Sequence, residues 1–297
     1  MDARSVRNVL QHRAGHGFGI HPQGSIVTLN LDLASAKAKV ARASELLDVL
    51  ERDLPIHLSQ NGPYAVRFSL DQHTGWCEVW LVPSNRGDYR FSLLFGDFIH
   101  NLRCALDYIV TALVIASGAQ LTTKHQFPIY RQEAIYTNDV GPFGSPNPKG
   151  PLGNVTHGVG LIESWQPYKL QQQGADPRDD PLWHVHRFAN ADKHREIAVF
   201  LPVPVGAIDV AYNGIKVEDD PVLTFPPNWS PDQEYVIHRM RFDPPDAYNL
   251  RATGKLTISA GFSTAPFGAE PFHAVAINKI RATCDHVAML VNLFETI

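Results

Sequence analysis

Residues 88–117 constrain the fold most, because they can form one long and largely apolar helix. At about 100° per residue, one side of this helix carries an unbroken apolar stripe. The stripe consists of Phe95, Phe98, Leu102, Leu106, Ile109 and Leu113. Gly118 follows at the position where a glycine commonly ends a helix. Other elements must cover such a stripe, so the pattern predicts a helical layer with its own core.

Helical periodicity recurs in three other segments: 31–54, 157–168 and 272–296. Pro55 should end the first of them, because proline lacks the N–H that a helix interior needs. A fourth helix should open after Asp180, whose side chain suits an N-cap, with Pro181 at the favoured first helical position. The chain is therefore expected to be helical up to about residue 200 and again at its end.

Alternating apolar and polar residues indicate strands in two regions. Residues 64–82 alternate on both sides of Gly75 and predict a β-hairpin with a short turn. Residues 206–265 alternate between Asn-Gly, Pro-Pro and Gly turns and predict an antiparallel sheet. The fold class is therefore α+β: an antiparallel helical layer, an N-terminal β-hairpin and a C-terminal antiparallel sheet closed by the terminal helix. The expected organisation is a single domain over 1–297, with an arm at 1–24, a mainly helical part at 31–200, the β-region and the terminal helix.

Charge and hydropathy narrow the classes of partner. The formal net charge of −4 gives no overall basic field, so nucleic acid is not a favoured partner, although a local basic patch is compatible with it. The apolar run 104–117 is interrupted by Asp107 and is too short to span a bilayer, and the N-terminus lacks a signal-like apolar core. The cysteines, Cys77, Cys104 and Cys284, lie far apart without CxxC spacing, which is typical of reduced thiols. These features predict a cytoplasmic protein without a membrane partner.

The helix at 88–117 also carries polar residues opposite its apolar stripe. His100, Arg103 and Asp107 fall within roughly 60° of one another. Asp107 is the only charge between 104 and 117, so we expect it to be covered and paired, with Arg103 as the obvious local partner. Small residues share this face: Gly96, Cys104 and Thr111. They would let another element approach closely.

The helix that begins after Asp180 offers a second polar stripe. His186, Asn190 and His194 follow at four-residue spacing, with Arg187 and Lys193 on the same arc of roughly 120°. A solvated helix surface is the plain alternative. Histidine changes charge near neutral pH, however, and serves as acid, base or metal ligand. The pattern therefore indicates a functional role for His186 or His194.

Four short motifs occur in a fixed order within residues 90–200. They are HNLRCALD at 100–107, QFPIY at 126–130, QPY at 166–168 and NADKHR at 190–195. The set resembles a family of uncharacterised bacterial proteins with HNLRxALD, FPI, QPY and NxxDKHR motifs. This resemblance implies that the two polar helices face each other. Members often carry His where this chain has Tyr108, which argues against a catalytic role for that position.

The residue types suit metal-free acid–base chemistry. A histidine would move protons, an aspartate would orient it, and a cation would stabilise negative charge. The candidate catalytic residues are His100, Arg103, Asp107 and His194, and the candidate substrate-binding residues are Asn101, His186, Asn190 and Lys193. The predicted function is a hydrolase acting on a small-molecule or nucleotide-like substrate, with phosphodiesters or RNA as one class. The spacing from Arg187 to His194 is also loosely similar to the Arg-x4–6-His motif of HEPN-type ribonucleases, compact helical proteins unlike a chain with a large β-region.

Three alternatives stay open. The polar cluster can be a structural network in a non-catalytic ligand-binding or interaction protein, with Phe225, Trp229 and Tyr235 of the β-region covering a pocket. A single divalent metal at His100, Asp107 and His194 is a weaker reading, because no HExxH pattern is present, and no cofactor is expected. Cys104 as a nucleophile is weaker than Cys104 as a small packing residue. The oligomeric state is left open.

Overall fold

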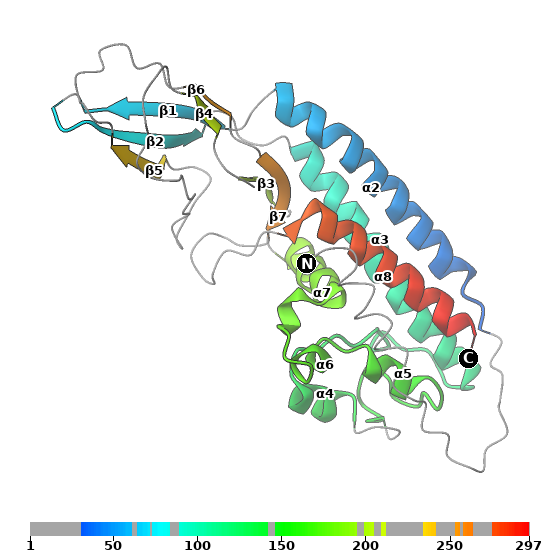
Figure 1. Cartoon of the computed structure of the whole chain (residues 1–297). Coiled ribbons are helices and arrows are strands. Elements are labelled where there is room, and N and C mark those ends of the chain that lie inside the picture. Colours follow the sequence, from blue (N-terminus) through cyan, green and yellow to red (C-terminus); the bar gives the residue numbers. More distant parts are fainter. Residues whose placement is uncertain are drawn as a thin grey trace. The chain divides into compact units, whose positions relative to one another are not determined.

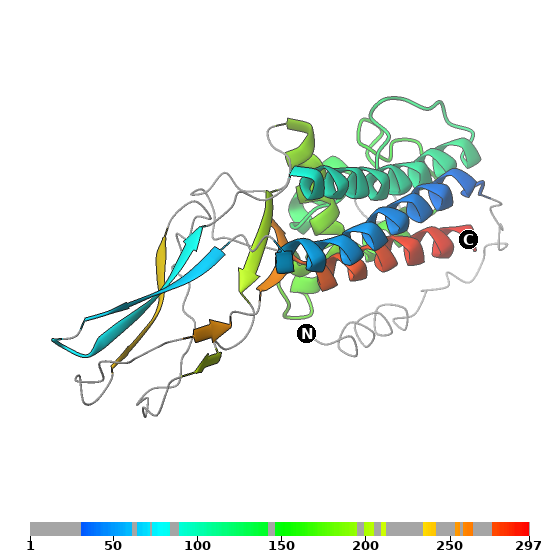
Figure 2. The same cartoon turned by 90° about the horizontal axis from the view of Figure 1, so that it is seen from above.

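The computed structural model contains helices and antiparallel strands (Figures 1 and 2), which confirms the α+β class. It describes residues 31–60, 64–71, 73–83, 89–141, 146–194, 199–204, 209–211, 234–241, 253–255, 258–263 and 275–296. The long helices are α2 (Ala34–Gln60), α3 (Tyr89–Ala116), α7 (Pro181–His194) and α8 (Ile277–Glu295). The short ones are α4 (Glu133–Asp139), α5 (Val159–Ser164), α6 (Tyr168–Gln171) and the 3-10 helix η1 (Pro177–Asp179).

The strands pair antiparallel throughout. Their bounds are β1 (Tyr64–Leu70), β2 (Trp76–Pro83), β3 (Val199–Pro204), β4 (Asp209–Ala211), β5 (Tyr235–Arg241), β6 (Thr253–Lys255), β7 (Ile258–Ser263) and β8 (Val275–Ala276). They form the sheets β1-β2-β5, β3-β7-β8 and β4-β6. The hairpin expected at 64–82 is confirmed, because β1 and β2 pair in register from Tyr64 with Pro83 to Leu70 with Cys77. Strand β5 pairs with this hairpin rather than with a later strand.

The chain divides into two compact units. The first contains residues 1–38, 104–183 and 287–297, and the second contains 39–103 and 184–286. Helices α2, α3, α7 and α8 each contribute residues to both. The expected single domain stays a prediction. The expected arm at 1–24 and most of the expected β-region lie outside the described residues.

In the first unit, the end of α3 is capped as its sequence indicates. Gly118 adopts a left-handed conformation with φ 66°. Its N–H bonds to the carbonyl of Ile115 at 2.9 Å, and the N–H of Ala119 bonds to that of Val114 at 3.1 Å. This is a Schellman motif, which satisfies two carbonyls that the helix end leaves open.

A second glycine of the first unit fixes how the helices approach. Gly158 has φ 74°, and a Cβ there would lie 3.0 Å from the side chain of Leu113 and 3.3 Å from that of Phe294. Both side chains are fully buried. Any larger residue at 158 would therefore push α5 away from the core formed by α3 and α8.

The core of the second unit is aromatic. Phe95 of α3 stacks on Phe262 of β7, with ring centroids 3.9 Å apart and an interplanar angle of 7°. Phe188 of α7 lies edge-on to the ring of Phe95, with ring centroids 4.8 Å apart. These rings join two helices and a strand, and each offers a large apolar surface for burial.

Two expected helix boundaries are wrong. Helix α2 continues through Pro55 to Gln60, because packing holds the turn beyond the proline: His57 lies edge-on to Phe91 with centroids 5.0 Å apart. The helix expected at 157–168 is divided into α5 and α6. Pro167 disfavours helical geometry at Gln166, the residue before it. The side chain of Gln166 bonds instead to the backbone of Tyr130 and Pro128.

Candidate functional site

The predicted polar residues of α3 differ in exposure. His100 is exposed, Arg103 is only 7% exposed, and Asp107 is half-buried. Asn101 is also buried. The expected acid–base cluster therefore does not lie on a uniformly open face.

Asp107 is held by the backbone of another segment of the first unit. Its Oδ1 accepts a hydrogen bond from the N–H of Phe127 at 2.8 Å. One turn further along α3, the hydroxyl of Thr111 donates to the carbonyl of Asp107 at 3.1 Å. Phe127 is buried, so the carboxylate satisfies an N–H that would otherwise be costly to bury.

Asn101 connects two helices of the second unit. Its Nδ2 donates to the carbonyl of Asp97 at 2.7 Å, and its Oδ1 accepts from Nζ of Lys39 in α2 at 3.1 Å. Each end of this buried carboxamide therefore has a partner within the protein. Its predicted role in substrate binding stays a prediction.

Helix α7 approaches α3 at Asp192. A Cβ added to Gly96 of α3 would lie 3.1 Å from Oδ1 of Asp192, so Asp192 marks the contact. His186 and Asn190 lie roughly 120–160° round the helix from Asp192. Their side chains are 2.9 Å apart, Nδ2 of Asn190 to Nε2 of His186. The described side chains therefore do not bring this pair to the polar stripe of α3.

Several predicted residues lie outside the description. The side chains of Lys193 and His194 are not described, nor are Phe225 and Trp229. Tyr235 lies at the start of β5. The catalytic role of His194 stays a prediction.

The extended segment 126–130 forms no strand, although its buried backbone needs partners. Gln166, which is 0% exposed, supplies them. Its Oε1 accepts from the N–H of Tyr130 at 2.9 Å and its Nε2 donates to the carbonyl of Pro128 at 2.8 Å. The same Nε2 lies 3.2 Å from the carbonyl of Ile162. One carboxamide thus replaces a neighbouring strand, and we call Asp107 and Gln166 together the backbone clamp.

Tyrosines surround a carboxylate beside the clamp. The hydroxyl of Tyr168 donates to Oε1 of Glu163 at 3.1 Å, and Nζ of Lys169 lies 3.7 Å from the same oxygen. Burial, and secondly the charge of Glu163, raise the pKa values of Tyr168 and Tyr136. Both phenols therefore stay neutral near pH 7 and are poor candidates for a general base.

A buried histidine lies between α7 and α8 in the second unit. The hydroxyl of Thr283 donates to the carbonyl of Lys279 at 2.9 Å. Its oxygen lies 3.4 Å from Nδ1 of His184. Since the hydroxyl has only one hydrogen, the His184 contact requires the proton on Nδ1.

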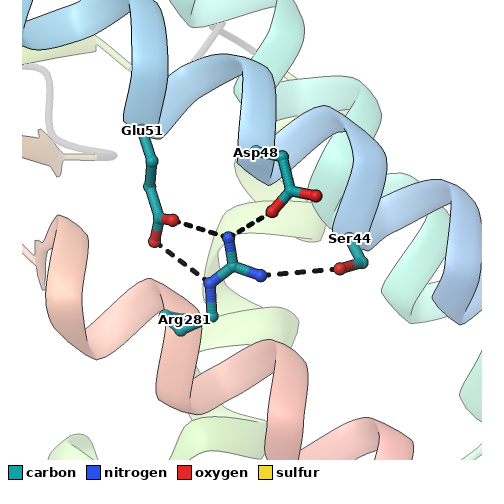
Figure 3. Close-up of polar contacts among 4 residues, drawn as sticks. All are labelled: Ser44, Asp48, Glu51 and Arg281. Carbon is teal, nitrogen blue, oxygen red and sulfur yellow. Dashed lines mark hydrogen bonds and ion pairs between the residues drawn. The ribbon is translucent and has the colours of Figure 1, made fainter.

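An ionic cluster joins α2 and α8 in the second unit (Figure 3). Arg281 bonds to both oxygens of Glu51, at 3.1 and 2.6 Å, and to Asp48 at 2.6 Å. Its remaining nitrogen lies 3.5 Å from the hydroxyl of Ser44. The hydrogen bonds to Glu51, more than those to Asp48, raise the pKa of Arg281. No local pattern in the sequence indicates this cluster, because its partners lie more than 200 residues apart in the chain.

Neither a metal nor a membrane role gains specific support. Within the described part of the chain, no group of three or more His, Cys, Asp or Glu residues could hold a metal ion. Of the described helices, α3 is long and apolar enough to cross a membrane. However, 61% of its most apolar window is buried inside the protein, as in an ordinary core helix.

Chemically, the described site residues offer hydrogen bonds to the protein's own backbone more than groups aimed at a ligand. The comparisons add no outside assignment. The chain matches no protein-family model, no curated protein and no solved structure.

Proposed function

We propose that this chain is a non-catalytic interaction protein whose polar motif residues stabilise the fold. The observation that carries the proposal is the bond between the Asp107 carboxylate and the N–H of Phe127. In the acid–base site that the sequence suggests, Asp107 would orient a histidine. Here one carboxylate oxygen supports the main chain.

The second motif residue supports the same reading. Gln166 is completely buried and bonds to backbone groups on both sides of Ile129. A fully buried carboxamide with backbone partners stabilises a fold and offers nothing to a ligand in solvent. Asp107 of HNLRCALD and Gln166 of QPY both bond to the backbone of QFPIY, which supports a structural role for these motif residues.

The open face of α3 provides a surface for an interaction. Leu93 is 56% exposed, Tyr108 38% and Ile115 65%. Helix faces that only meet solvent usually carry Lys and Glu instead. These exposed apolar side chains, spaced along one helix, offer a partner apolar surface to bury.

Hydrolase assays on matched variants test the proposal. Wild-type protein, His100→Ala and Asp107→Ala are incubated with bis-p-nitrophenyl phosphate and with a short RNA, and the unfolding temperature of each is measured. We expect the same background rate for all three, with a lower unfolding temperature only for Asp107→Ala. Turnover that disappears in His100→Ala at unchanged unfolding temperature contradicts the proposal.

A hydrolase remains the second candidate, because His100 is exposed and Arg103 follows it by three residues on α3. In that function His100 would transfer protons and Arg103 would stabilise a developing negative charge, with phosphodiesters or RNA as substrate class. A bell-shaped pH profile of turnover, with a limb that is lost in His100→Ala, is the result expected from it.

A further inference from the structure

We propose that Tyr136 and Glu163 bind one enclosed water molecule, which links helix α4 to helix α5 within the first unit. The site lies inside the protein and is independent of the interaction function above. Its walls include Tyr130 and Tyr168, the last residues of the motifs QFPIY and QPY.

Two polar atoms in this part of the first unit are buried without a hydrogen bond. Among the described residues, neither the hydroxyl of Tyr136 nor Oε2 of Glu163 has a partner, and the two do not bond to each other. Tyr136 is only 1% exposed. Most buried polar groups in folded proteins are bonded to the protein or to ordered water, and an unsatisfied one is costly. We therefore expect these two atoms to hold a ligand.

Contacts with Tyr168 place the two atoms at one site. The ring of Tyr136 lies against that of Tyr168, with ring centroids 5.7 Å apart. The hydroxyl of Tyr168 donates in turn to Oε1 of Glu163 at 3.1 Å. Burial, and secondly the charge of Glu163, raise the pKa of Tyr136, which is the effect of a nearby carboxylate. The carboxylate thus lies beside both phenols, with one oxygen bonded to Tyr168.

The chemistry of the two atoms defines the ligand. The hydroxyl of Tyr136 needs an acceptor for its proton, and Oε2 of the Glu163 carboxylate needs a donor. A water molecule is both at once and can bridge two such groups. An ammonium or potassium ion would leave the Tyr136 proton without an acceptor. Nζ of Lys169, 3.7 Å from Oε1 of Glu163, already supplies a positive charge here.

Aromatic rings and burial separate the site from solvent. Tyr130 lies edge-on to Tyr136, with ring centroids 6.0 Å apart, and Tyr168 is only 2% exposed. Gln166 of the backbone clamp bonds to the N–H of Tyr130 and so holds one of these walls. A water enclosed in this way is part of the structure and costly to remove.

High-resolution crystallography of the full chain tests the site directly. We expect one density peak within about 3.2 Å of both the Tyr136 hydroxyl and Oε2 of Glu163. If no peak contacts both atoms, the proposal is overturned. A crystal soaked in rubidium chloride separates water from a monovalent cation. We expect no anomalous rubidium signal at this position, and a signal there overturns the assignment to water.

Two variants that each remove one hydroxyl separate the bridge from the surrounding packing. Tyr136→Phe removes the proposed donor and keeps its ring, so the peak should disappear. Tyr168→Phe is the matched control, because it also removes a hydroxyl beside Glu163 but keeps both proposed partners of the water. The peak should stay in this control. A peak that survives in Tyr136→Phe, or that is lost equally in both variants, contradicts the bridge.

Urea unfolding measures the same link in solution. Two side chains that share a water should have non-additive effects although they form no direct bond. Tyr136→Phe should lower the folding equilibrium constant by about fivefold in the wild type and by less than about twofold in Glu163→Ala. Equal effects of Tyr136→Phe in both backgrounds overturn the proposal.

Discussion

The backbone clamp and the open face of α3 contain opposite ends of the HNLRCALD motif, Asp107 and His100, and use them differently. In the clamp, the side chains of Asp107 and Gln166 form hydrogen bonds to main-chain groups of the segment 126–130. On the open face, His100 and Tyr108 point to solvent among apolar and small residues. Polar side chains within one motif can therefore act either as internal support or as surface, and burial tells the two apart.

Removal of the clamp carboxamide should have the largest effect on stability. In Gln166→Ala, the N–H of Tyr130 and the carbonyl of Pro128 lose their partner, at a cost of about 3 kcal/mol in unfolding free energy. Gln166→Glu keeps an acceptor for the Tyr130 N–H but places a carboxylate beside the Pro128 carbonyl at a fully buried position, so it should lose at least as much stability. Urea unfolding measures all three proteins. A loss of unfolding free energy no larger than that of a surface substitution would contradict the stabilising role of Gln166.

Removal of the other clamp residue should cost less. Asp107→Ala leaves one buried N–H without an acceptor, at about 2 kcal/mol. Asp107→Asn keeps a carbonyl oxygen in the same place and should recover most of that loss. If the two variants are equally destabilised, the bond to Phe127 is not the source of the effect.

The Arg281 cluster belongs to neither region, and its removal provides a reference value for the loss of unfolding free energy. Its pairs are partly exposed, so Arg281→Ala should reduce the unfolding free energy by about 1 kcal/mol. Because exposed ion pairs are screened, part of this difference should vanish when unfolding is repeated in 1 M salt. A difference that is independent of salt would point to lost packing instead.

The open face should give the smallest effect. His100→Ala and Ile115→Ser remove exposed side chains, so each should change the unfolding free energy by less than about 0.5 kcal/mol. If either variant loses as much unfolding free energy as Asp107→Ala, the open face contributes to stability as the clamp does, and the proposed difference between the two regions is wrong.

The sequence predicts elements better than it predicts this contrast. The apolar stripe, the C-cap at Gly118 and the N-cap at Asp180, which accepts from the N–H of Leu182 at 2.8 Å, are local signals and are confirmed. Continuation of α2 beyond Pro55 depends on packing against Phe91, which no local pattern contains. The same holds for the candidate site: which polar residues of the motif are buried depends on partners 20 to 38 positions away in the chain. In the sequence, Gln166 is a polar residue before a proline, and no local pattern indicates that it is buried.

Amide hydrogen exchange at Phe127, followed by NMR, tests the central claim most directly. We expect strong protection of the Phe127 amide in the wild type. In Asp107→Ala, the Phe127 amide should lose this protection while the Tyr130 amide stays protected by its bond to Gln166. Rapid exchange of Phe127 in the wild type, or equal loss at both amides, would contradict the claim that Asp107 holds this segment.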